Sequence, residues 1–140
     1  DGTLNALATG QRTIVLGGYE RIFGQPALYS AAGPGLGTSA TAARIGPSAM
    51  APSDFTRVHR GVIGAGARSG SAFALSGTSV AAPQLARRIA GAMAAGAWPP
   101  PGGLASWVLS PPPPGWPQPL QATRAGAGRI ATPTILTAPR

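Results

Sequence analysis

The chain has little of what most enzyme sites are made from. Its 140 residues include no cysteine, only three acidic residues and one histidine, and all eleven basic residues are arginine. The absence of cysteine excludes disulfides and thiol chemistry, and the few acids and the histidine are too widely spaced to form a metal site. No apolar run is long enough to cross a membrane. The sequence therefore predicts no metal, no cofactor and no membrane span.

Glycine and proline are abundant, with 21 and 16 residues, while 44% of the chain is hydrophobic and 10% is charged. This composition favours a folded, loop-rich segment over a disordered one. The net charge of +8 is compatible with a nucleic-acid-binding surface or with a surface that meets an acidic partner. The arginines are scattered, and no aromatic side chains interleave with them as stacking platforms. We therefore favour an acidic complement on another chain over nucleic acid.

The most informative stretch runs from Ser76 to Pro83, where a glycine turn leads directly into a helix rich in small residues. Gly77 can adopt backbone angles that residues with a Cβ avoid, so the chain can turn sharply there. We expect Thr78 or Ser79 to cap the helix through its hydroxyl, and Pro83 to lie in a first turn that does not need its N–H. Ser79 would then lie at the positive end of a helix, a favourable position for a nucleophile. Apolar residues continue at helical spacing, at Leu85, Ile89 and Met93.

The same stretch resembles the catalytic-serine motif of subtilisin-like serine proteases, Gly-Thr-Ser-x-Ala-x-Pro, and matches it at Gly77, Thr78, Ser79, Ala81 and Pro83. An ordinary turn with a serine cap is the alternative, which the added alanine, proline and helix disfavour. The resemblance implies an α/β, subtilisin-like three-layer fold with a mostly parallel sheet, of which this chain is only the C-terminal part. The helix starting at Ser79 would be buried centrally. Weaker matches follow the family's order at Tyr29, Ser30, Gly33 and Pro34, at Ile45, Pro47, Ala51 and Pro52, and at residues 126–130.

Other segments predict short elements separated by loops. Residues 13–18 are a β-branched run closed by glycines, which is typical of a buried strand in a parallel sheet. Residues 62–66 are a second apolar piece that we expect to be extended. Residues 35–48 have the composition of a surface excursion, and residues 126–130 resemble the glycine turn that closes the family's domain.

The base that a serine nucleophile needs is not evident in this chain. A serine hydroxyl is activated by a base, usually a histidine held by a carboxylate. Subtilisin-like proteases carry these groups in the order Asp, His, Ser, so the resemblance places both partners N-terminal to Ser79. The single histidine, His59, lies only 20 residues before Ser79 and lacks the family's His-Gly-Thr context, so we interpret it as a loop residue. None of the acids, Asp1, Glu20 and Asp54, lies in the family's Asp-x-Gly context.

The oxyanion-hole donor of the family is an asparagine in an Ala-Gly-Asn stretch. Asn5, the only asparagine, lacks that context, whereas Asp1-Gly2 resembles the continuation just after it. The resemblance therefore implies an N-terminal chain of the same processed or split protein that supplies the Asp, the His and the oxyanion Asn. Gly77 and Thr78 would support the turn and the oxyanion site, together with the Ser79 backbone N–H.

The proline content changes near residue 96. We expect residues 1–95 to form the C-terminal part of the catalytic domain, and residues 96–140 a proline-rich segment that wraps and closes the same domain. The proline runs at 99–101 and 111–114 predict polyproline II, and the apolar patch at 104–109 is expected to dock on the core. A ligand for a proline-binding module is the alternative to this stiff connector.

These observations together predict a serine endopeptidase that hydrolyses peptide bonds through an acyl-enzyme on Ser79, as one half of a heterodimer. Its substrate would be a peptide or protein, with no metal and no cofactor. Two alternatives stay open, a catalytically inactive interaction module of the same fold and a basic module that binds polyanions. The compartment stays open as well, because a mature or internal fragment would have lost any signal peptide; we incline to a secreted or cell-envelope protein.

Overall fold

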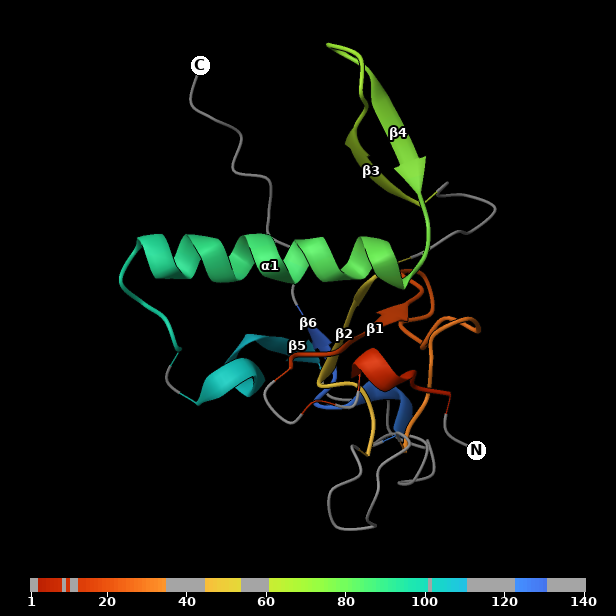
Figure 1. The fold of residues 1–140 in the computed structure, drawn as a ribbon, viewed down its shortest axis with the longest axis vertical. Helices are drawn as coiled ribbons and strands as arrows, with labels where there is room; N and C mark the ends of the chain where they lie inside the picture. The colour runs from red at the N-terminus through yellow and green to blue at the C-terminus, as the bar shows by residue number, and fades with distance from the viewer. Residues whose placement is uncertain are drawn as a thin grey trace.

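The architecture comes from a computed structural model, which describes residues 3–8, 10, 13–34, 45–53, 61–100, 102–110 and 123–130. Within these ranges one long helix lies across one face of a small sheet, and a separate hairpin projects from the start of that helix (Figure 1). The elements in chain order are η1 Ala6–Ala8, β1 Leu16–Tyr19, β2 Ala49–Pro52, β3 Val62–Ala65, β4 Ala72–Leu75, α1 Thr78–Ala94, η2 Gly103–Trp107, β5 Val108–Ser110 and β6 Arg129–Ile130.

The main sheet has four strands in the order β1-β2-β6-β5. β1 pairs in parallel with β2, from Leu16 opposite Ala49 to Tyr19 opposite Pro52, and β2 pairs in parallel with β6. Only β5 runs antiparallel to its neighbour. The predicted class, α/β with a mostly parallel sheet, is therefore confirmed for the part of the chain that the structure describes.

The predicted strand at 13–18 is confirmed in part, since β1 begins three residues later and ends at Tyr19. β2 was not predicted, because its Ala-Met-Ala-Pro segment has neither β-branched residues nor alternation. It becomes a strand because it is buried along its whole length between β1 and β6. The extended piece at 62–66 is confirmed as β3, which pairs with β4 in an exposed antiparallel hairpin. Most of the predicted surface excursion at 35–48 lies outside the described residues.

The helix predicted after Gly77 is confirmed as the 17-residue α1, which packs against β1 and β2. Its buried residues are Ala81 and Leu85, and Leu85 joins Ala49 and Ile130 in one apolar cluster. The expected central burial of α1 refers to the domain completed by a partner chain; in this chain the side of α1 opposite the sheet is exposed. Met93, predicted on the apolar face, is 60% exposed. The C-terminal end of α1 extends beyond the sheet, so the last turns of the helix have fewer contacts with the core (Figure 1).

The apolar patch at 104–109 does dock, because Leu104 and Trp107 pack against the cluster around Leu85. The Trp107 ring lies 5.6 Å from the Trp98 ring, between centroids, and the Arg88 guanidinium lies 4.5 Å from the Trp107 centroid. Partial burial lowers the pKa of Arg88 below its ordinary value, while the aromatic face stabilises its positive charge. This contact fastens the segment after α1 to the sheet side of the helix. The second proline run, 111–114, lies outside the described residues.

None of the helices among the described residues combines the length and the apolar character needed to cross a membrane.

Candidate active site at the start of α1

The serine turn has the sharp backbone that its sequence predicts. Gly77 precedes α1 with φ +122° and ψ 161°, angles that a residue with a Cβ rarely adopts. α1 begins at Thr78, and Ser79 is its second residue, with an exposed side chain. The expected hydroxyl cap is wrong, because Gly77 is the N-cap and no side chain caps the helix. The Ser79 hydroxyl is therefore not used to hold the helix end.

The first turn of α1 leaves polar backbone groups available beside this hydroxyl. The N–H groups of Thr78 and Ser79 donate to no described residue, whereas the Val80 N–H donates to the Gly77 carbonyl oxygen at 3.0 Å. Pro83 lies one turn inside the helix and not in its first turn, contrary to expectation. Because Pro83 has no N–H, the Ser79 carbonyl lacks its usual partner four residues ahead. Free N–H groups and the helix dipole together favour negative charge at this position.

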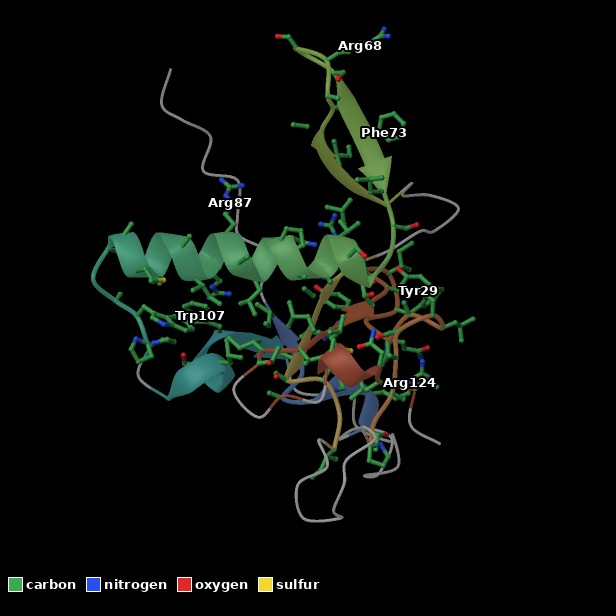
Figure 2. All side chains as sticks on the ribbon, in the orientation of Figure 1. Tyr29, Arg68, Phe73, Arg87, Trp107 and Arg124 are labelled. Carbon is green, nitrogen blue, oxygen red and sulfur yellow. The ribbon has the colours of Figure 1, made fainter. Side chains whose placement is uncertain are left out.

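The turn is anchored by Pro52, the last residue of β2, and by Ser53, which follows it. The Gly77 N–H donates to the Ser53 carbonyl oxygen at 3.0 Å, and the Gln84 side chain donates through Nε2 to the Pro52 carbonyl oxygen at 2.7 Å. The Tyr29 hydroxyl donates to the same Ser53 carbonyl and lies 3.0 Å from Ser53 Oγ. Figure 2 shows Tyr29 beside the start of α1. Two successive carbonyls at the end of β2 therefore hold the turn and the first turns of the helix.

Close packing beneath the turn depends on a glycine in β1. Ser53 is fully buried, and a Cβ at Gly18 would collide with its Oγ and would also contact the Thr78 methyl group. The Gly18 N–H in turn donates to Ser30 Oγ at 3.0 Å. Sequence reasoning missed the roles of Ser53, Gly18 and Gln84. The Gly17-Gly18 pair at the end of a predicted strand was the one available signal, since glycine in a strand marks close approach of another group.

Removing the Tyr29 hydroxyl tests this anchor. We expect Tyr29→Phe to lower the free energy of unfolding by about 1 kcal/mol, because a half-buried hydrogen bond to the Ser53 carbonyl is lost. Urea unfolding of the full chain measures the change. Ser53→Ala is the matched control, because it removes the contact of the Tyr29 hydroxyl with Ser53 Oγ but keeps the hydrogen bond to the Ser53 carbonyl oxygen. An equal stability of Tyr29→Phe and the parent chain would contradict the anchor.

An apolar groove opens next to Ser79. It has a volume of about 280 Å³ and lies between α1 and the β3–β4 hairpin. Ser79, Pro83 and Arg87 line it from the helix, each one turn apart, so they lie on one face of α1. A second apolar hollow of about 250 Å³, bordered by Ile14 and Ala82, lies between α1 and β1.

The other sequence-predicted residues are not brought to this site by the described part of the chain. His59, Asp1 and Asp54 lie outside the described residues. Glu20 directly follows β1, and Asn5 accepts a hydrogen bond from the Ala8 N–H through Oδ1, at 3.2 Å, within its own 3₁₀ turn. The described residues therefore place Ser79 and free backbone N–H groups together at the start of α1, and among them no histidine or carboxylate lies at Ser79.

Several arginines are engaged within the chain itself. Arg124 donates through Nη2 to the carbonyl oxygens of Ala27, Leu28 and Ser30, and Arg129 lies over the Tyr19 ring. Arg88 contacts Trp107 in the same manner. The described residues hold no group of three or more His, Cys, Asp or Glu side chains that could bind a metal ion.

Comparisons with protein-family models, with curated proteins and with solved structures found no match to this chain in any of the three.

Proposed function

We propose that this chain is the nucleophile-bearing half of a subtilisin-like serine endopeptidase, and that Ser79 forms the acyl-enzyme. One observation carries the proposal: Ser79 is exposed at the start of a 17-residue helix, just after a glycine turn at φ +122°, with its hydroxyl and backbone N–H uncommitted among the described residues. A serine nucleophile needs this combination, because the hydroxyl must reach the substrate while the backbone N–H meets the developing oxyanion.

The proposed reaction assigns each group one role. Ser79 Oγ attacks the scissile carbonyl while a histidine on a second chain takes the hydroxyl proton. The Ser79 N–H and an asparagine side chain of that second chain stabilise the oxyanion. The C–N bond then breaks, the histidine gives its proton to the leaving amine, and a water molecule hydrolyses the acyl-enzyme. The subtilisin-like three-layer fold, completed by an N-terminal chain of the same precursor, belongs to this proposal.

The anchoring hydrogen bonds support the proposal because they restrain the nucleophile without using it. The carbonyls of Pro52 and Ser53 hold Gln84 and Gly77, on either side of Ser79 along the chain. A nucleophile that waits for a substrate must be held by its neighbours and not by its own hydroxyl. The arrangement at the start of α1 meets that condition.

Intact mass spectrometry after treatment with a fluorophosphonate tests the proposal. The 13.8 kDa chain should gain one phosphonyl group when its partner chain is present, and tryptic peptides should place the adduct on Ser79. A partner chain without any label would instead support the catalytically inactive interaction module. A lone, folded 13.8 kDa monomer would contradict the two-chain unit itself.

A further inference from the structure

The corner between α1 and the β3–β4 hairpin is an apolar surface that the described chain leaves uncovered. Val62, Ile63 and Leu75 line the groove from the hairpin, and Val80, Pro83 and Arg87 line it from the helix. In Figure 2, Arg87 lies on the side of α1 from which the hairpin rises, and Phe73 extends from the hairpin itself. The groove is therefore one continuous surface contributed by two elements.

The exposure of these apolar side chains is large enough to require an explanation. Of the residues that line the groove, Ile63 is 75% exposed and Leu75 51%, and Phe73 on the same hairpin is 65% exposed. Among the described residues eleven large hydrophobic side chains are exposed, whereas only five are buried, namely Leu4, Tyr19, Met50, Leu85 and Ile130. Scattered exposed leucines are normal, but a hairpin that is apolar on both strands and faces a groove marks an interaction site.

Arg87 gives this surface its charge. Among the described residues that line the groove it is the only ionisable side chain, and it makes no ion pair with any described residue. Glu20 is the only acid in the described ranges, and it directly follows β1. Eight residues separate Ser79 from Arg87 on one face of the helix, which corresponds to about 12 Å. Apolar side chains and a carboxylate would complement the two kinds of group that an occupant of this length meets.

We infer that this groove is the docking surface for the chain that supplies the base to Ser79, through a segment with an apolar face and a carboxylate that pairs with Arg87. The inference rests on the proposed function. A base must come within about 3 Å of Ser79 Oγ, so its segment must be seated beside the first turn of α1, where the groove opens.

Charge complementarity selects this occupant over two others. A second copy of this chain carries a net charge of +8 and would bring arginine toward arginine. A nucleic acid needs several positive charges and aromatic side chains on which bases stack, whereas the described lining of this groove is apolar with one charged side chain and no aromatic residue. An acidic polypeptide segment satisfies both the apolar lining and Arg87.

The test measures heterodimer affinity separately from activity. The full 140-residue chain is produced together with the polypeptide encoded immediately upstream in its reading frame, and the heterodimer dissociation constant is measured by native mass spectrometry. Arg87→Glu and Leu75→Asp should each weaken the heterodimer by about tenfold or more. The matched controls are Arg68→Glu, at the hairpin tip, and Leu28→Asp, at a 90% exposed leucine, which should change it by less than about twofold.

Each outcome decides one question. If all four variants bind like the parent chain while Ser79 is still labelled, the docking surface is wrong and the proposed function stands. Sensitivity at Arg87 and Leu75 without labelling would support the docking surface and contradict the enzyme. Absence of any heterodimer would overturn both. Self-association that the groove variants abolish would assign the surface to a second copy.

Discussion

Ser79→Ala is expected to abolish fluorophosphonate labelling of the chain and to lower peptide hydrolysis by the two-chain unit on the order of 10⁶-fold. The serine is the covalent centre of the proposed mechanism, so its removal leaves the oxyanion donors and substrate binding but no nucleophile. Labelling is read by intact mass spectrometry, and hydrolysis by release of a fluorophore from a peptide substrate.

Ser76→Ala is the matched control for this prediction. Ser76 lies in the same turn, is also exposed, and precedes Gly77 by one residue. If the turn merely presents reactive hydroxyls, both substitutions should reduce labelling equally. If Ser79 is the nucleophile, the Ser76 variant keeps its label. Retention of the label in Ser79→Ala would refute the proposed role of Ser79.

Gly126→Ala is expected to lower the free energy of unfolding by roughly 3 kcal/mol, the largest stability effect of any single methyl group proposed for this chain. Gly126 has φ +58°, which an alanine adopts only at a cost. An added Cβ would also collide with the carbonyl oxygen of Pro47 and with the backbone of Ser48. Both obstacles are main chain and cannot rotate away.

The damage should extend to the sheet, because the chain near Gly126 aligns β6 with β2. The Ala127 N–H donates to the Ser48 carbonyl oxygen at 3.0 Å, and the Met50 N–H donates to the Gly128 carbonyl oxygen at 2.8 Å. Urea unfolding should show a midpoint lower by about 2 M at an unchanged slope.

Gly91→Ala is the control, for which we expect the free energy of unfolding to rise instead of fall. Gly91 lies inside α1, and an added Cβ would meet nothing within 4 Å outside the helix itself. Alanine should stabilise the helix by about 1 kcal/mol, because glycine has a greater conformational entropy to lose. Equal effects of the two substitutions would show that the tertiary contacts of Gly126 do not matter.

Local interactions explain what could be predicted from the sequence. The sharp turn at Gly77 and the helix that follows it depend on residues within one or two turns of each other, so the pattern of glycine, small residues and apolar spacing was sufficient. The same holds for β1, because the β-branched residues 13–15 that precede it and the glycines at 17 and 18 are neighbours in the sequence. The position of Pro83 and the identity of the cap were wrong, because helix boundaries depend on hydrogen bonds that propensity does not resolve.

By itself, then, the sequence determined the turn, the helix and the place of Ser79 on it, since these follow from backbone angles and side-chain period. Only the tertiary structure decided that β2 is a strand, that its final carbonyls hold the turn, and that Tyr29 reaches the Ser53 carbonyl from 24 residues away. It also decided that one side of α1 and the hairpin remain exposed around Arg87. Contacts between distant segments depend on burial and on complementary shape, and a local pattern of residues predicts neither.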